Sequence, residues 1–185
     1  MSQRTRSRVR LAVAAFAALA VLGAGTAQAA PTPSQLYHAL LKKPRAGSLP
    51  SALSGAKAHS AKLSPGSRSH HAVGAVEIGN TAALVGYLLF PSHALALADL
   101  KAFPPNRGPN KIVTTHPAGL PRPAFILSAR GNGYEAAYAV FVLDNVVVDA
   151  WAYGTKGTSK KLRTIVEADA RWAKSHALQA KAAAG

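Results

Sequence analysis

Three side chains near the end of the chain have the types and spacing of a small binding site. Asp149, Trp151 and Tyr153 alternate along a stretch rich in valine and alanine, and alternate residues of a β-strand share one face. Two aromatic rings beside an acid can line a ligand pocket, because rings supply apolar contact and a carboxylate accepts hydrogen bonds. The same residues could equally be core with hydrogen-bonded polar tips. Both interpretations stay open at this point.

Catalytic and metal-binding patterns are weaker. The chain has no cysteine and no Gly-x-Ser-x-Gly motif, so thiolate chemistry and a nucleophile elbow are both excluded. His70-His71 are adjacent, and adjacent strand residues point to opposite faces, so we predict no metal site there. We assign no catalytic residue and expect no cofactor. A Ser-His-Asp triad would need separated residues, drawn from Ser92 or Ser128, His93 or His116, and Asp149.

Much of the N-terminal half contains basic residues and no acidic residue. The formal net charge is +15, and four of these charges are arginines among the first ten residues, which leaves +11 beyond them. No acid lies between Pro31 and Val76. Such a surface attracts anionic lipid headgroups and cell-surface polymers in a salt-dependent way, without specific nucleic acid recognition. Alternatively, the scattered charge serves only solubility. The candidate anion-binding residues are Lys42, Lys43, Arg45, Lys57, Lys62 and Arg68.

The first thirty residues have the order of a secretory signal peptide. Met1–Arg10 is basic, Leu11–Gly23 is an unbroken apolar run, and Ala27-Gln28-Ala29 offers the small residues of a cleavage site. The apolar run is shorter than the roughly 20 residues of a membrane span. We therefore predict a secreted protein, extracellular, periplasmic or in the cell envelope. An uncleaved N-terminal anchor is the alternative.

Turn and cap residues divide the rest of the chain into strands and helices. Two hairpins are the clearest: 72–78 with 83–90 around Gly79-Asn80-Thr81, and 134–143 with 146–153 around Asp144-Asn145. Asp and Asn both tolerate the backbone conformations that tight turns need. Further strands are predicted at 56–63, 112–115 and 125–129. The predicted helices are one capped by Ser34 that stops before Pro44, one opened by Pro91-Ser92 that stops before Pro104, and one capped by Ser159.

Hairpins that alternate with helices predict the α+β class. We expect an antiparallel sheet built from hairpins, with helices packed on one face in a two-layer arrangement. The strand over 136–142 is apolar on both faces, so it is central or covered on both sides. The predicted division is 1–29 signal peptide, 30–71 N-terminal helix and basic loop-rich segment, 72–178 α+β core domain, and 179–185 frayed tail.

Two segments, with the export signal, carry a resemblance to other proteins. They are His70-His71-Ala72-Val73-Gly74-Ala75-Val76 and Gly86-Tyr87-Leu88-Leu89-Phe90-Pro91-Ser92. With them the chain resembles small secreted proteins of unknown function from high-GC bacteria. The order of elements is also similar to the extracellular PsbP-like and kinase-sensor domains, in topology alone. Neither resemblance implies a site residue, a cofactor or a partner.

Taken together, these patterns predict a secreted, non-enzymatic binding or envelope-associated domain of unknown ligand. Two alternatives stay open. One is a small secreted hydrolase whose site is assembled from separated residues. The other is a polyanion-binding or surface-binding protein that acts through its basic segment.

Cleavage after Ala29 is directly measurable. Mass spectrometry of culture supernatant is expected to find a mature chain that begins at or beside Ala30. Recovery of an intact chain beginning at Met1 in the membrane fraction would contradict the predicted signal peptide.

Overall fold

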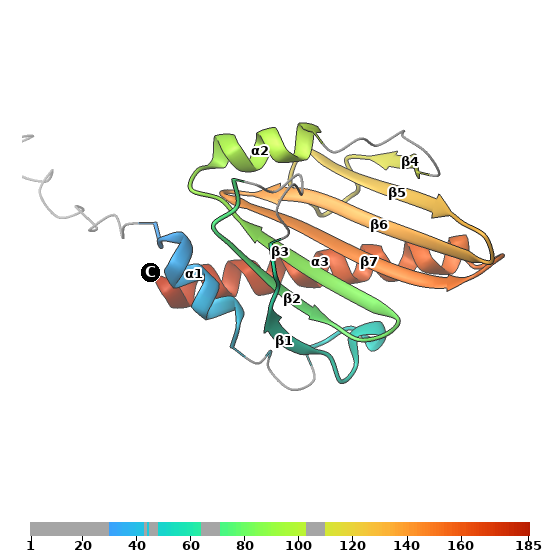
Figure 1. The fold of residues 1–185 in the computed structure, drawn as a ribbon, viewed down its shortest axis with the longest axis horizontal. Coiled ribbons are helices and arrows are strands. Elements are labelled where there is room, and N and C mark those ends of the chain that lie inside the picture. Colours follow the sequence, from blue (N-terminus) through green and yellow to red (C-terminus); the bar gives the residue numbers. More distant parts are fainter. Residues whose placement is uncertain (1–29, 43, 45–47, 64–70, 103–109) are drawn as a thin grey trace, which may run out of the picture. The chain divides into compact units, whose positions relative to one another are not determined.

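The fold is an antiparallel sheet with packed helices. The computed structural model describes residues 30–42, 44, 48–63, 71–102 and 110–185, so the predicted signal peptide lies outside the described residues. Within these residues seven strands form one sheet in the order β1-β2-β3-β7-β6-β5-β4 (Figure 1). The predicted α+β class is confirmed. No helix in this part of the chain is long and apolar enough to cross a membrane.

Most predicted elements are present. Both hairpins are confirmed, and Leu143 stands opposite Val146, so the second hairpin has a two-residue turn. The predicted edge strand near 56–63 is confirmed as the short β1. The elements are α1 (Pro33–Leu40), the 3-10 helix η1 (Ser51–Leu53), β1 (Lys57–Ser60), β2 (Gly74–Gly79), β3 (Ala83–Leu89), α2 (His93–Ala102), β4 (Asn110–Thr115), β5 (Ala124–Arg130), β6 (Tyr134–Leu143), β7 (Val146–Thr155) and α3 (Ser159–Ala184).

The sheet is covered on both faces, by different helices. On the first face, Phe141 and Val148 pack in one core with Val166 of α3, and α1 joins the same core. On the second face, Val140 of β6 packs with Ala96 of α2. The strand over 136–142 is predicted to be central or covered on both sides, and β6 is an inner strand with Phe141 and Val140 in the cores of opposite faces. We predicted that the helices pack on one face of the sheet. This is true of α1 and α3, whereas α2 packs on the opposite face, because β6 and β7 present apolar residues to both sides.

The N-terminal helix begins at a different cap from the predicted one. Thr32, rather than Ser34, is the N-cap of α1, and its hydroxyl accepts a hydrogen bond from the Gln35 amide at 3.2 Å. The Gln35 side chain accepts in return from the Thr32 amide at 2.8 Å. Pro33 determines where the helix begins, because its fixed φ suits the first helical residue. The N-cap is then the residue just before Pro33, which is Thr32.

The last helix also differs from the prediction at both ends. Thr158 is its N-cap residue, while the Ser159 hydroxyl donates a hydrogen bond to Glu135 at 2.6 Å. At the other end α3 continues to Ala184, so the residues predicted as a frayed tail are helical up to that point. The reason is burial, because Ala177 and Ala180 pack into the first-face core.

Several described residues between 30 and 63 belong to the main core. Leu36, Leu40 and Leu53 are buried in the first-face core, and β1 pairs with β2 in the sheet. Pro31–Gly185 accordingly forms one compact unit. The division into a segment over 30–71 and a core domain over 72–178 stays a prediction.

The turn between β6 and β7 connects four parts of the fold. Asp144 adopts a φ of +52°, its carbonyl accepts from His93 Nδ1 at 2.6 Å, and its carboxylate binds Lys181 near the end of α3. Asn145 donates from its side chain to the Phe90 carbonyl at 2.8 Å and accepts from the Phe90 amide at 2.9 Å. The turn thus holds α2, α3 and the end of β3 together.

Removing the Asn145 amide should weaken this junction. Asn145→Ala loses the hydrogen bond to the Phe90 carbonyl, and we expect a loss of about 1 kcal/mol in the free energy of unfolding. Urea unfolding measures it, with Asn132→Ala in the exposed turn after β5 as the control. Equal midpoints for the two variants would show that the Asn145 bond does not stabilise the fold.

One carboxyl group is buried without compensation. Asp169 of α3 is fully buried, and neither of its carboxylate oxygens has a hydrogen-bond partner among the described residues. Burial raises the pKa of Asp169 from 3.8 to about 6. The folded protein therefore holds this proton more tightly than the unfolded chain does. Its contribution to stability is full below pH 4 and is lost as the pH rises through 6.

Asp169→Asn should therefore stabilise the protein at neutral pH and not at low pH. At pH 7.5 we expect a gain of about 1 kcal/mol, because an ionised buried group is replaced by a neutral one. At pH 4 the gain should vanish. Thermal unfolding at the two pH values checks this, with the half-exposed Glu167→Gln on the same helix as the control. The same gain at both pH values would contradict the raised pKa.

Candidate functional site

Part of the second face carries a group of aromatic residues that are partly or largely exposed. Tyr138 of β6 stands directly opposite Trp151 of β7, with ring centroids 4.9 Å apart in an edge-to-face arrangement. Tyr153 follows on β7, 6.2 Å from Trp151 between centroids. Tyr153 is 42% exposed and Tyr134 is 48% exposed. We call this surface the aromatic face; its residues are Glu77, Tyr134, Tyr138, Asp149, Trp151 and Tyr153.

Two carboxylates lie in one row beside the rings. The pairing places Glu77 of β2, Gly86 of β3 and Asp149 of β7 side by side across three strands. A Cβ atom on Gly86 would lie 2.1 Å from Asp149 Oδ1. The Asp149 carboxylate therefore occupies the space that glycine leaves open. Glu77 is partly exposed and pairs with the exposed His59, Nε2 to Oε2 at 3.3 Å.

A second glycine makes room for a ring at the far end of the aromatic face. A Cβ on Gly131 would lie 2.1 Å from the Tyr134 ring. The Tyr134 ring therefore lies across the turn between β5 and β6, and a larger residue at 131 would displace it.

The surroundings of Tyr153 raise its pKa, mainly by burial. Burial raises the pKa of Tyr153 to about 12, helped by the charges of Tyr138, Asp149, Tyr134 and Glu77. Burial also raises the pKa of Tyr138. Both phenols therefore stay protonated at neutral pH and can donate hydrogen bonds. The face offers aromatic rings, hydroxyl donors and carboxylate acceptors.

The three residues proposed from the sequence are on this face together. Asp149, Trp151 and Tyr153 share the second face, as their alternation predicts. Their binding role stays a prediction. Glu77, Tyr134 and Tyr138, the other members of the aromatic face, were not identified from the sequence. The position of Tyr138 could have been found by counting back from the two-residue turn, because that turn sets the pairing with Trp151.

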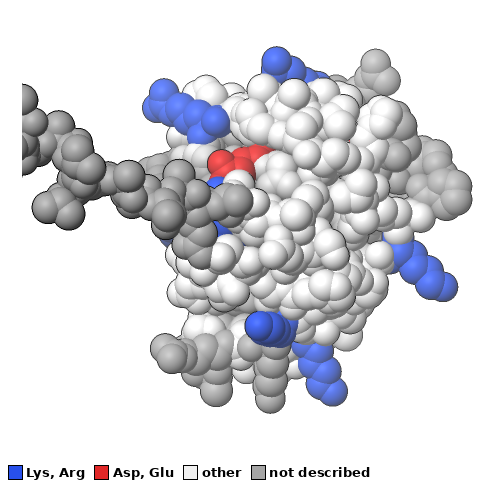
Figure 2. All heavy atoms as spheres, turned by 90° about the vertical axis from the view of Figure 1, so that its left-hand side faces the viewer, with Lys and Arg blue, Asp and Glu red and all other residues white. Residues whose placement is uncertain are grey.

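The proposed cationic residues are distributed over several elements. Lys42 follows α1, Lys57 lies on the edge strand β1, and Lys62 follows β1; all three are exposed. Figure 2 shows that the lysine and arginine side chains on the side it presents stand apart rather than forming a continuous patch. Binding of anions by these residues stays a prediction. Lys43, Arg45 and Arg68 lie outside the described residues.

Several candidate triad residues have structural roles. The Ser92 hydroxyl caps α2 by accepting from the Leu95 amide at 3.3 Å. His93 donates to the Asp144 carbonyl. Ser128 stands opposite Ala137, which faces the first-face core, whereas Asp149 lies on the second face. His116 lies just after β4.

The structure also bears on the histidine pair. His71 is exposed just before β2, and His70 lies outside the described residues. In the described part of the chain, no group of three or more His, Asp or Glu side chains could hold a metal ion.

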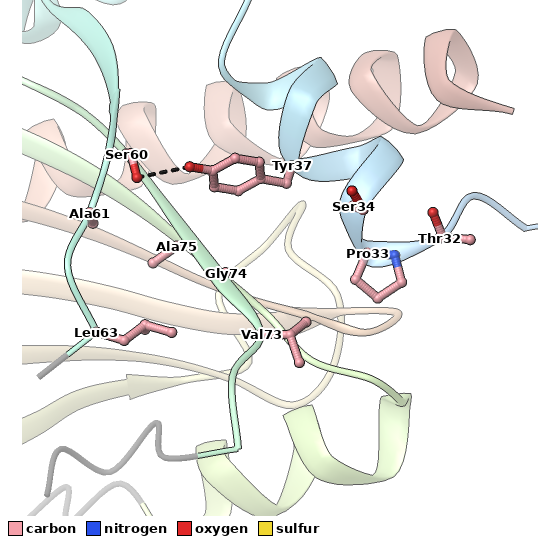
Figure 3. Close-up of a pocket in the computed structure, with 10 residues that line it drawn as sticks. All are labelled: Thr32, Pro33, Ser34, Tyr37, Ser60, Ala61, Leu63, Val73, Gly74 and Ala75. Atoms are coloured by element: carbon pink, nitrogen blue, oxygen red, sulfur yellow. Dashed lines mark hydrogen bonds between the residues drawn. The ribbon is translucent and has the colours of Figure 1, made fainter. Parts of the chain in front are cut away.

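A separate pocket of about 580 Å³ lies between α1, β1 and β2. Figure 3 shows Tyr37 of α1 reaching across it to Ser60 of β1, to which its hydroxyl donates at 2.8 Å. Gly74 leaves the space that the Tyr37 ring fills. The described lining carries hydroxyl and apolar groups and no charged side chain, with Val73 exposed at its rim. The pocket shares no residue with the aromatic face.

Comparisons with known proteins assign no function to the site. No family model matches the chain, and no curated protein does. Among solved structures, the chain is similar to the extracellular domain of PknH from Mycobacterium tuberculosis, with 15% sequence identity and a TM-score of 0.34. The match covers 62% of this chain and 65% of that chain, less than two thirds of its length. A likeness of this extent carries no argument about function.

The environment of Tyr153 can be tested by its titration. In protein labelled with carbon-13 at the tyrosine rings, the Tyr153 signal should keep its phenol shift until the pH approaches 12. Asp149→Asn should lower that pKa, because it removes a negative neighbour. Circular dichroism over the same range shows that the fold persists. Titration near 10, the value of an exposed tyrosine, would contradict the described surroundings.

Proposed function

We propose that the protein is a secreted, non-enzymatic binding domain of the cell envelope that takes its ligand on the aromatic face. The observation that carries the proposal is the partly exposed group of Tyr138, Trp151 and Tyr153 on the second face of the sheet. Exposed aromatic groups of this kind are characteristic of binding surfaces. Secretion is inferred from the order of residues at the N-terminus.

Binding is favoured over hydrolysis by the roles of the candidate catalytic groups. Ser92 and His93 hold α2 in place, and Ser128 is on the face opposite Asp149. A nucleophile needs a base within hydrogen-bond reach, which these positions do not supply. The remaining carboxylates, Asp149 and Glu77, fit the role of hydrogen-bond acceptors.

Cosedimentation with washed, protein-free bacterial cell walls tests the proposal. The mature protein should pellet with the walls, and the double variant Trp151→Ala with Tyr153→Ala should bind about tenfold more weakly, because ring contacts are lost. Val73→Lys at the separate pocket is the matched control and should bind like the parent. Chromogenic ester, peptide and glycoside substrates should remain intact.

The competing interpretations give different results in the same assay. If the basic segment is responsible, Lys57→Gln with Lys62→Gln should release the protein, and so should moderate salt. If the pocket is responsible, Val73→Lys should release it. Undiminished binding by the double aromatic variant would overturn the proposed function, and turnover of a chromogenic substrate would favour the hydrolase.

A further inference from the structure

The aromatic face presents several rings that are tilted to one another, with interplanar angles of 73° between Tyr138 and Trp151 and 57° between Trp151 and Tyr153. Trp151 and Tyr138 lie side by side on adjacent strands, and Tyr153 and Tyr134 extend the group along the same two strands. Adjacent strands are about 4.8 Å apart, so these side chains form a surface wider than one ring. Aromatic faces carry negative partial charge and attract the weakly positive C–H groups of a ring that lies flat on them. An extended ligand made of rings fits this surface better than a compact one does.

The carboxylates add a second requirement on the ligand. Asp149 precedes Trp151 by two residues on the same face, and Glu77 lies two strands away in the row of Gly86. Two strand spacings separate them by about 10 Å at the backbone. Ionised carboxylates only accept hydrogen bonds, so the ligand must donate them. Hydroxyl groups spaced along a chain of rings meet this requirement, and hydrogen bonds to a charged acceptor are among the stronger ones.

Charge decides among the polymers that carry rings. Nucleic acids and acidic polysaccharides also present rings, but their negative groups would lie against Asp149 and Glu77 and be repelled. A polycation would gain from these two acids, but it would meet a chain whose net charge beyond the first ten residues is +11. An uncharged chain of hydroxyl-bearing rings meets neither repulsion.

We propose that the aromatic face binds an uncharged polysaccharide, whose sugar rings stack on Trp151 and Tyr153 and whose hydroxyls donate to Asp149 and Glu77. This inference rests on the proposed function for the place of the site, and goes beyond it by naming the chemical class of the ligand. Gly86 leaves room for the Asp149 carboxylate, and Gly131 leaves room for the Tyr134 ring at the far end of the aromatic face.

Soluble hexasaccharides that differ in charge test the ligand class. The neutral probes are hexamers of β-1,4-linked glucose and of N-acetylglucosamine, the anionic probe is hexagalacturonate, and the cationic probe is the glucosamine hexamer at pH 5.5. Binding is followed by tryptophan fluorescence in the Trp172→Phe variant, where Trp151 is the remaining tryptophan. Trp172 stacks on His176, and it packs against the first-face core, so its loss leaves the aromatic face intact.

Single substitutions test whether the hexamers bind through the proposed contacts. Binding by alanine variants is followed by calorimetry. Trp151→Ala should weaken the association constant for a neutral hexamer about tenfold, and Asp149→Asn should weaken it about threefold or more. Glu167→Gln on α3 removes one acid from another part of the surface and should change nothing. Gly131→Ala, which must displace the Tyr134 ring, should weaken binding while leaving the unfolding temperature near that of the parent.

Each outcome supports or overturns the inference. Binding of a neutral hexamer, with loss in Trp151→Ala and no binding of hexagalacturonate, supports it. Preference for the glucosamine hexamer or for hexagalacturonate overturns the proposal that the ligand is uncharged, but leaves the aromatic face as the site. No binding of any hexamer, while cell walls still bind through Trp151, overturns the inference alone. Failure in both assays overturns the proposed function as well.

Discussion

The turn at Asp144-Asn145 is the interaction on which the remaining structure depends. It joins the two longest strands and sets their pairing, so that Leu143 opposes Val146 and Tyr138 opposes Trp151. Its backbone and side chains also bind His93 of α2, Lys181 of α3 and Phe90 at the end of β3. One two-residue loop therefore aligns the central strands and attaches the helices of both faces near the same end of the sheet.

The position of α2 explains why part of the second face stays open. A ten-residue helix is about 15 Å long, whereas a ten-residue strand is about 34 Å long. Attached to the turn through His93, α2 can cover less than half the length of β6 and β7 (Figure 1). The 26 residues of α3 span about 39 Å, which is enough to cover the first face from end to end. The aromatic face thus follows from the difference between these lengths.

Local signals in the sequence predict the strands and the turns well. Asn80 and Asp144-Asn145 mark both hairpins, and Ser92 marks the start of α2, because turn and cap chemistry involves residues only a few positions apart. The cap of α1 was misplaced by two residues, since Pro33 outweighs Ser34. The alternation of Asp149, Trp151 and Tyr153 placed them correctly on one face.

Features that depend on distant parts of the chain could not be predicted in this way. Ser159 bonds Glu135, which is 24 residues away, so its role differs from that of a local cap. Glu77 reaches the row of Asp149 only because β3 pairs with β7, a pairing that crosses more than fifty residues of chain. The packing of α2 on the second face depends on its attachment to a turn 51 residues later. The site therefore combines residues that local patterns identify with residues that only the sheet order brings near.

Amide chemical-shift mapping shows whether a ligand binds at the open end of the second face. Protein labelled with nitrogen-15 is titrated with a neutral hexasaccharide that binds. We expect shifts at residues 134–138 and 151–155 and at Gly86, with the amides of α2 and of the Tyr37 pocket unchanged. Shifts confined to α1, β1 and the pocket between them, or spread along α3, would contradict it.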